Sequence, residues 1–447
     1  MHRTAEIDLI DWLNEEPRMP LLIRGARQVG KTTLIYHFAE KYFKDNWLEI
    51  NFELEPKFKD CFNSLDPIDI ITAINFIAQT KITPNKTLLF LDEIQDCPQA
   101  ILALRYFKEK MPQLHVIAAG SLLEFTLNKP DFRMPVGRVE SLYIKPLSFF
   151  EFLQATEPVD NIDYLQQINI DSNIPTAIHD KLMHSVQNYL LLGGMPAIIN
   201  RYLKTKDFIR IEKLQGSLLN NYRSDFGKYG EKINLSLLQN VFNQLPGLVA
   251  QHFKYSRLDI EAKSRELKPI LQALYDAGLA YPVHACHASG LPLAVGKNDR
   301  KFKLLFIDIG LMQHSLGVSA DLFMSKDIML INQGQLVEQF VGQELQAYAP
   351  RYETCDLYYW DRDVMSAQAE IDYLYTYKQH IIPIEVKAGK SGRLKSLHLF
   401  LKEKNARLGL KISSAPLSRN DNLFSVPLYL LWKLPDFMQQ LAARDLL

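Results

Sequence analysis

The first 150 residues alternate short apolar runs with amphipathic stretches. Leu21-Leu22-Ile23 is followed by the amphipathic segment 33–42, and two further apolar runs occupy 87–91 and 115–119. Short apolar runs bounded by turn residues are typical of buried parallel strands, and a period of about 3.6 residues predicts helices. We therefore expect residues 1–150 to form an α/β domain with a parallel sheet.

The pattern changes at about Ser148, where helical periodicity replaces the buried strands. A predicted apolar helix ends at Gly193-Gly194, and Pro196 begins the next one. Glycine suits the end of a helix and proline suits its first turn, so a structural turn explains this segment. Residues 151–230 are predicted to form a helical lid.

Residues 231–330 have the spacing of a winged-helix-like domain. Apolar positions predict helices over 235–246 and 269–277. Two strands, at 279–283 and 301–307, would follow as a wing hairpin. The basic residues that precede or open the second helix are Lys263, Arg265 and Lys268. Such a helix can contact DNA, but winged helices also dock proteins, and both partners remain open.

A phosphate-binding loop lies between the first predicted strand and its helix. It is the Walker A segment Gly25-Ala26-Arg27-Gln28-Val29-Gly30-Lys31-Thr32-Thr33. Backbone N–H groups at such a helix N-terminus cradle phosphates, and Lys31 reaches the β- and γ-phosphates. The Thr32 hydroxyl is placed to ligate Mg²⁺. The sequence therefore predicts that this loop binds ATP together with Mg²⁺.

The second apolar run ends in Asp92 and Glu93, as a Walker B strand does. Asp92 is expected to hold the Mg²⁺ shell, and Glu93 to orient or deprotonate the attacking water. The third run leads into Ser121, which could touch the γ-phosphate or that water, in the manner of sensor 1 of AAA-type ATPases. A helix-capping role is the alternative for the acidic pair and for the serine. Lys31, Glu93 and Ser121 are thus the predicted catalytic residues of an ATP hydrolase.

Two arginines follow on a loop, Arg133 and Arg138. Charge that develops on the γ-phosphate in the transition state needs a cation, so either could act as an arginine finger toward a neighbouring subunit. A solvated surface arginine is the alternative for each.

The last region, 331–447, carries acidic and basic residues on two alternating stretches. Glu385 and Lys387 share one face of the strand predicted at 381–387. A hairpin would bring Asp372 beside them, so that the carboxylates could bind Mg²⁺ and Lys387 could activate water against a phosphodiester.

Glu338 or Glu344, on the helix predicted at 336–348, could add a further metal ligand. The spacing of Asp372, Glu385 and Lys387 resembles the (D/E)-x-K core of restriction-endonuclease-like folds. An exposed Glu-Lys ion pair is the alternative.

Composition adds limits on location and partners. The 447 residues include 51 basic and 51 acidic ones, so any binding to nucleic acid must come from a local patch. The four cysteines are far apart, which fits a reducing cytoplasm. The N-terminus does not read as a secretory signal, and no window approaches about 18 apolar residues. We therefore expect a cytoplasmic protein without a membrane span.

The whole chain resembles a family of prokaryotic AAA-type ATPases that carry a C-terminal domain of unknown function. The resemblance is carried by the Walker A segment and by the segments 146–152, 193–196, 306–311, 359–362 and 382–389. The resemblance implies a cytoplasmic, ATP-binding protein of bacterial or archaeal type with a nuclease-like C-terminal region.

Two hypotheses follow. In the first, ATP binding and hydrolysis switch the arrangement of the lid and the winged helix, and the output is DNA binding or cleavage. In the second, ATP regulates the docking of a protein partner, and the cluster of Asp372, Glu385 and Lys387 is structural. A hexameric remodelling motor ranks last, because no aromatic pore loop is evident.

Overall fold

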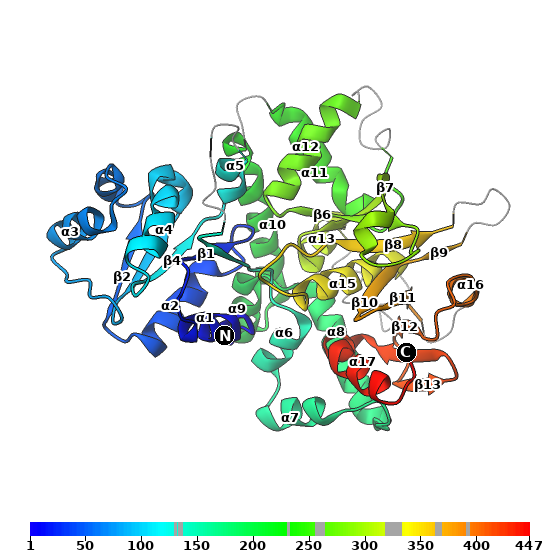
Figure 1. Cartoon of the computed structure of the whole chain (residues 1–447). Coiled ribbons are helices and arrows are strands. Elements are labelled where there is room, and N and C mark those ends of the chain that lie inside the picture. Colours follow the sequence, from blue (N-terminus) through cyan, green and yellow to red (C-terminus); the bar gives the residue numbers. More distant parts are fainter. Residues whose placement is uncertain are drawn as a thin grey trace.

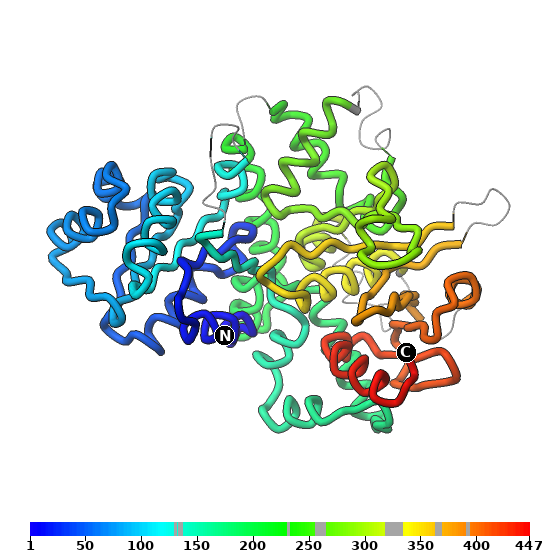
Figure 2. The backbone as a smooth tube through the Cα atoms, viewed as in Figure 1, coloured from blue at the N-terminus to red at the C-terminus, as the bar shows by residue number. Residues whose placement is uncertain are grey.

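The computed structural model describes residues 1–128, 132, 137–229, 233–254, 264–317, 333–362, 369–389 and 394–447. Within these ranges the strands form three sheets (Figure 1). The N-terminal domain, the central helices and the two C-terminal sheets follow one another across the molecule in chain order, as the tube in Figure 2 shows.

The first sheet has five strands, and all its pairs are parallel. In spatial order they are β2 (Trp47–Asn51), β3 (Leu88–Asp92), β4 (His115–Ala119), β1 (Leu21–Arg24) and β5 (Glu140–Tyr143). The carboxyl ends of parallel strands meet at one edge, so the loops after β1, β3 and β4 lie together. The predicted parallel α/β fold is confirmed.

Helices cover both faces of this sheet. They are α1 (Ala5–Asn14), α2 (Lys31–Tyr42), α3 (Pro67–Ala78) and α4 (Pro98–Lys110). Ile23 packs in one hydrophobic cluster with Phe38 of α2, whereas its neighbour Leu22 packs in another with Leu104 of α4. Burial on both faces explains why these strands are apolar throughout rather than alternating.

Helices dominate the segment after β5, as predicted. The short α5 (Leu123–Leu127) precedes β5, and the helices that follow β5 are α6 (Phe149–Thr156), α7 (Val159–Gln167), α8 (Thr176–Leu192), α9 (Pro196–Thr205) and α10 (Phe208–Asp225). A capping box fixes the start of α6, because Ser148 and Glu151 each bond the other's backbone N–H. Helix α8 ends before Gly193 and α9 begins at Pro196, as the sequence predicts.

The second sheet combines strands from before and after residue 330. It contains β7 (Lys297–Phe306), β6 (Ala280–Cys286), β8 (Leu357–Asp361) and β9 (Glu370–Ile371), in that spatial order. The helices around it are α11 (Leu235–Leu248), α12 (Ser264–Asp276), α13 (Ile309–Leu316) and α15 (Gln333–Ala347).

The order of two helices and a hairpin predicted for the winged helix is present in α11, α12, β6 and β7. The hairpin is not a free wing, however, because β6 also pairs in parallel with β8. The winged-helix interpretation and the division at residue 330 therefore stay predictions.

The third sheet contains β10 (Tyr373–Tyr377), β11 (His380–Lys387), β12 (Gly409–Ser413), β14 (Leu423–Pro427) and β13 (Ser418–Asn420), in spatial order. Helices α16 (Lys395–Glu403) and α17 (Leu434–Ala443) complete it. Strands β10 and β11 form an antiparallel hairpin, while β11 and β12 run parallel. The predicted hairpin between 376 and 380 is confirmed.

Candidate nucleotide site and C-terminal carboxylate cluster

The predicted Walker A segment connects β1 to α2. A Cβ atom on Gly25 would lie 2.2 Å from the carbonyl oxygen of Ile144, so only glycine fits beside β5. Gly25 and Gly30 both have positive φ, at 136° and 91°, which lets the loop curl tightly before the helix. Within the segment, Ala26 and Val29 are buried, whereas Gln28 and Thr33 are exposed.

Lys31 lies inside this loop and is 7% exposed. Its Nζ donates to the carbonyl oxygens of Gly25 at 2.9 Å and Ala26 at 2.8 Å. Burial lowers the pKa of Lys31 to about 8, although Glu93 and Asp92 partly oppose this shift. A charged amine held by carbonyl dipoles alone is poised to exchange them for phosphate oxygens.

The Thr32 hydroxyl donates to Oδ2 of Asp92 at 3.2 Å. Asn51, at the end of the neighbouring β2, donates to the same oxygen at 3.4 Å. Burial and the adjacent Glu93 raise the pKa of Asp92 to about 6. A hydroxyl and a carboxylate are hard oxygen ligands of the kind Mg²⁺ prefers, so this pair fits the ion that accompanies ATP.

Glu93 follows β3 with a φ of 49°, which turns its side chain toward the end of β4. Its Oε2 accepts hydrogen bonds from Ser121 Oγ at 3.2 Å and from Gln95 Nε2 at 2.7 Å. The predicted Walker B and sensor 1 residues thus meet. Sequence reasoning missed Gln95 and Asn51; a polar residue at the end of a predicted strand or just after one is the signal that would have found them.

The predicted arginine fingers gain no support from the structure. Arg138 pairs with Glu109 of α4 at 3.2 Å, and its side chain is 46% exposed. Arg133 lies outside the described residues. The structure places a different arginine, Arg27 of the loop itself, against Ser121 Oγ at 3.1 Å.

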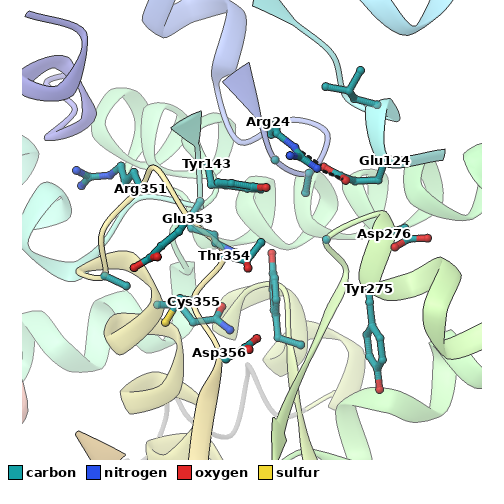
Figure 3. A pocket seen from close by; sticks show the side chains of 18 of the residues that line it. Arg24, Glu124, Tyr143, Tyr275, Asp276, Arg351, Glu353, Thr354, Cys355 and Asp356 are labelled. Atoms are coloured by element: carbon teal, nitrogen blue, oxygen red, sulfur yellow. Dashed lines mark hydrogen bonds and ion pairs between the residues drawn. The ribbon is translucent and has the colours of Figure 1, made fainter. Parts of the chain in front are cut away.

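A cleft of about 220 Å³ separates the start of the phosphate loop from the C-terminal half (Figure 3). On one side Arg24 pairs with Glu124 and lies over the ring of Tyr143, 4.7 Å from its centroid. On the other side lies the loop around Arg351, whose carbonyl accepts the Tyr143 N–H at 2.8 Å. This hydrogen bond attaches β5 directly to the segment that leads into β8.

The predicted C-terminal residues also come together. Asp372 lies between β9 and β10, and its Oδ2 accepts the N–H of Val386 on β11 at 2.7 Å. Lys387 Nζ is 2.5 Å from Glu385 Oε1, so the Glu-Lys pair is formed. Burial, with Asp372 adding to it, raises the pKa of Glu385 to about 7.

A lysine that sequence reasoning missed lies among these carboxylates. Lys303 of β7 is 2% exposed, and its Nζ lies 2.8 Å from Glu338 Oε1 and 4.0 Å from Asp372 Oδ1. It also forms an ion pair with Glu370. Burial opposes its charge, but the three carboxylates together raise the pKa of Lys303, so it remains an ammonium. Burial raises the pKa of Glu338 to about 8.

Glu344, the other predicted ligand, belongs elsewhere, and that prediction is wrong. Its carboxylate accepts the Phe149 N–H at 2.9 Å and the Tyr189 hydroxyl at 3.2 Å, deep between α15, α6 and α8. It faces these helices because it is six residues beyond Glu338, which turns it away on α15. Among the described residues, no three His, Cys, Asp or Glu side chains are grouped to hold a metal ion.

Comparison with known proteins agrees with the N-terminal geometry. Residues 17–153 match the family model described as an AAA domain. The N-terminal region therefore has the α/β fold of an AAA-type P-loop domain. Residues 183–322 and 333–431 match two domains of unknown function, DUF8612 and DUF4143.

Individual relatives are distant. The uncharacterised protein MJ1544 of Methanocaldococcus jannaschii is 26% identical over 198 residues, which are 44% of this chain and 39% of that protein. The chain thus matches about two-fifths of that relative's length.

Two solved structures are also similar to parts of this chain. The Walker-type ATPase PABY2304 of Pyrococcus abyssi is 16% identical, with a TM-score of 0.43, over 70% of this chain and 95% of that one. The ORC2 protein of Aeropyrum pernix in its ADP form is 10% identical, with a TM-score of 0.30, over 74% and 94%.

In the part of the chain described by the structure, no helix has the length and apolarity needed to cross a membrane.

Proposed function

We propose that this protein is a Mg²⁺-dependent ATP hydrolase of the cytoplasm that uses bound ATP as a conformational switch. The observation that supports this most strongly is the convergence of Lys31, Thr32, Asp92, Glu93 and Ser121 at one sheet edge. These are the groups that phosphoryl transfer to water requires. The match to an AAA domain supports the same activity.

Each group has a distinct task in this proposal. Lys31 binds the β- and γ-phosphates, while Thr32 and Asp92 hold Mg²⁺, which neutralises phosphate charge when bound. Glu93 orients the attacking water and accepts its proton. Ser121 and Gln95 hold the Glu93 carboxylate in place through hydrogen bonds to Oε2. Gly25, Ala26, Arg27, Gln28, Val29, Gly30 and Thr33 complete the phosphate-binding segment.

The switch would act through the segment Gly193 to Pro196. The Pro196 ring lies against Gly30 of the phosphate loop, 3.3 Å from where a Cβ would stand. The Gly194 N–H donates to the buried Asp308 at 2.6 Å, and burial raises the pKa of Asp308 to about 6. A change in the loop on ATP binding would thus reach α9 and, through Asp308, the start of α13.

The test is ATP hydrolysis by the wild type, Lys31→Ala and Glu93→Gln, with ATP binding measured on the same samples. We expect Lys31→Ala to bind ATP weakly and Glu93→Gln to bind it normally without turnover. Turnover by Glu93→Gln at the wild-type rate would contradict the role given to Glu93.

For the C-terminal region we propose a nuclease-like fold whose carboxylate cluster is not catalytic and which docks a protein partner. The nuclease-like fold is proposed from the succession of helix α15, the hairpin β10–β11, helix α16 and strand β12, which runs parallel to β11. Lys303 supports the non-catalytic assignment, because its ammonium already lies against Glu338 and Asp372, two of the carboxylates that would bind Mg²⁺. DNA binding or cleavage, with Asp372, Glu385 and Glu338 as metal ligands, is the competing proposal.

Mg²⁺-dependent nicking of supercoiled DNA by the wild type and Lys387→Ala separates the two. We expect no nicking by either protein, with or without ATP. Nicking that disappears in Lys387→Ala would establish the nuclease instead.

A further inference from the structure

Arg27 is the third residue of the phosphate loop and differs from its neighbours by pointing into the site. Its Nε donates to Ser121 Oγ at 3.1 Å, and its guanidinium forms an ion pair with Asp225. The side chain is 23% exposed, so the guanidinium is largely removed from water. Burial lowers its pKa, but Asp225, together with Glu93 and Glu53, outweighs this, and the net pKa of Arg27 is raised.

Hydrogen bonds connect this arginine to the group that would activate water. Ser121, which accepts from Arg27, itself donates to Oε2 of Glu93 at 3.2 Å. Arg27 also lines a cleft of about 280 Å³ with Gln95, the second donor to Glu93. A terminal phosphate that contacts Ser121, with its attacking water on Glu93, therefore lies within reach of the same guanidinium.

The lid helix α10 holds Arg27 at two points. Asp225, its last residue, pairs with the guanidinium and is 7% exposed, while the Tyr222 hydroxyl donates to the Arg27 carbonyl oxygen at 2.9 Å. Lys228 lies 3.9 Å from the same oxygen of Asp225. Asp225 therefore keeps a cationic neighbour if Arg27 turns away from it.

We propose that Arg27 is the arginine that contacts the γ-phosphate during hydrolysis, supplied by the same chain, and that Asp225 holds it until ATP enters. This rests on the proposed ATP hydrolysis. A guanidinium binds two phosphate oxygens at once, so the dianionic phosphate competes well with one carboxylate. When Arg27 exchanges Asp225 for the γ-phosphate, Asp225 no longer contacts the phosphate loop. The attachment of α10 to this loop is therefore looser only while the γ-phosphate is present.

The chemical step is ordinary hydrolysis. The water oxygen forms a bond to the γ-phosphorus as the bond to the β,γ-bridging oxygen breaks, and that oxygen leaves on ADP. One water proton passes to the Glu93 carboxylate. Arg27 transfers nothing and stabilises the charge that grows on the γ-phosphate oxygens.

The experiment compares Arg27→Ala, Arg27→Lys and the surface control Arg105→Ala, whose side chain on α4 is 53% exposed, in steady-state hydrolysis and in binding of ADP and ATPγS. We expect Arg27→Ala to lower kcat by roughly a thousand-fold or more, as loss of an arginine finger does, with ADP affinity changed less than about three-fold. Arg27→Lys should keep part of the activity, and Arg105→Ala should match the wild type. Arg27→Ala with wild-type kcat would overturn the proposal.

Mixing distinguishes supply within a chain from supply by a neighbour. Lys31→Ala lacks the phosphate lysine but keeps Arg27, so an equal mixture with Arg27→Ala would regain activity if Arg27 served an adjacent subunit. We expect no recovery above the sum of the two proteins. Recovery would overturn the assignment to the same chain.

The binding data separate this inference from the proposed function. If the wild type hydrolyses no ATP, the hydrolase proposal fails. The contact of Arg27 with the γ-phosphate is then tested by the dissociation constant for ADP divided by that for ATPγS. We expect Arg27→Ala to lower that ratio by about ten-fold or more, since one charge-assisted contact to the γ-phosphate is lost. A ratio equal to that of the wild type would overturn the contact. Asp225→Asn should raise the ratio, because Arg27 is then free to bind phosphate.

Discussion

The two carboxylate sites of this protein contain the same residue types but distribute charge differently. In the P-loop domain, Lys31 bonds backbone carbonyls, and Asp92 and Glu93 accept hydrogen bonds from neutral groups. In the C-terminal cluster, Lys303 lies within 4.0 Å of three carboxylates. We therefore expect the position of one buried lysine to distinguish a carboxylate set that can bind Mg²⁺ from one that is already paired with a cation.

The largest expected effect comes from Lys303→Met. Removing the cation takes the buried ion-pair partner away from Glu338 and Glu370 and leaves Asp372 beside them, which costs about 3–5 kcal/mol in comparable cases. Urea unfolding at neutral pH measures the change. Lys301→Met is the matched control, because Lys301 is on the same strand but its side chain is 40% exposed, and less than about 1 kcal/mol is expected. Equal losses from the two variants would contradict the assigned role.

The pH dependence of stability should differ in sign between the two lysines. Burial lowers the pKa of Lys31 from 10.5 to about 8, so the unfolded chain binds more protons in this window. The contribution of Lys31 to the free energy of unfolding therefore becomes more favourable by about 3 kcal/mol as pH rises from about 8 to above 10. The pKa of Lys303 is raised, so its stabilisation is present below about pH 10.5 and is lost only above that.

Unfolding of the wild type and Lys31→Met from about pH 7.5 to pH 10 measures this difference. The stability advantage of Lys31→Met should shrink as pH rises. An advantage that grows with pH would contradict burial as the dominant cause.

A moderate effect is expected for ATP affinity in Lys31→Ala. Loss of one charge-assisted contact should weaken ATP binding about 10- to 100-fold, while stability is unchanged or improved because no carboxylate loses an ion-pair partner. Calorimetry and urea unfolding of the same protein give both quantities. A stability loss as large as that of Lys303→Met would remove the contrast between the sites.

The smallest effect is expected for Asn51→Ala. Asp92 loses one neutral donor, so the Mg²⁺ concentration for half-maximal hydrolysis should rise only about three-fold. A Mg²⁺ titration at saturating ATP measures it, with Asn46→Ala as a control from the loop before β2. No change in Mg²⁺ dependence would show that Asn51 does not position Asp92.

Sequence predicted the AAA-type sheet because its strands are buried on both faces and its loops carry chemistry at fixed spacing. It also placed Asp372, Glu385 and Lys387 together, since the alternation of β11 and a short hairpin determine that geometry. The sequence did not reveal Lys303, because it lies on β7, far from the carboxylates in the chain. The pairing of β6 with β8 joins the strands before residue 330 to those after it, and such a long-range pairing leaves no local sequence pattern. Glu344 was misplaced because helical periodicity alone did not say which face of α15 meets which partner.

Mn²⁺ binding, followed by electron paramagnetic resonance as a substitute for Mg²⁺, tests the comparison most directly. The wild type should bind one Mn²⁺ in the presence of ADP or ATPγS, and Lys31→Ala should not bind it. Neither protein should bind Mn²⁺ when nucleotide is absent. Nucleotide-independent binding that disappears in Asp372→Asn would place the metal in the C-terminal cluster and contradict the neutralising role of Lys303.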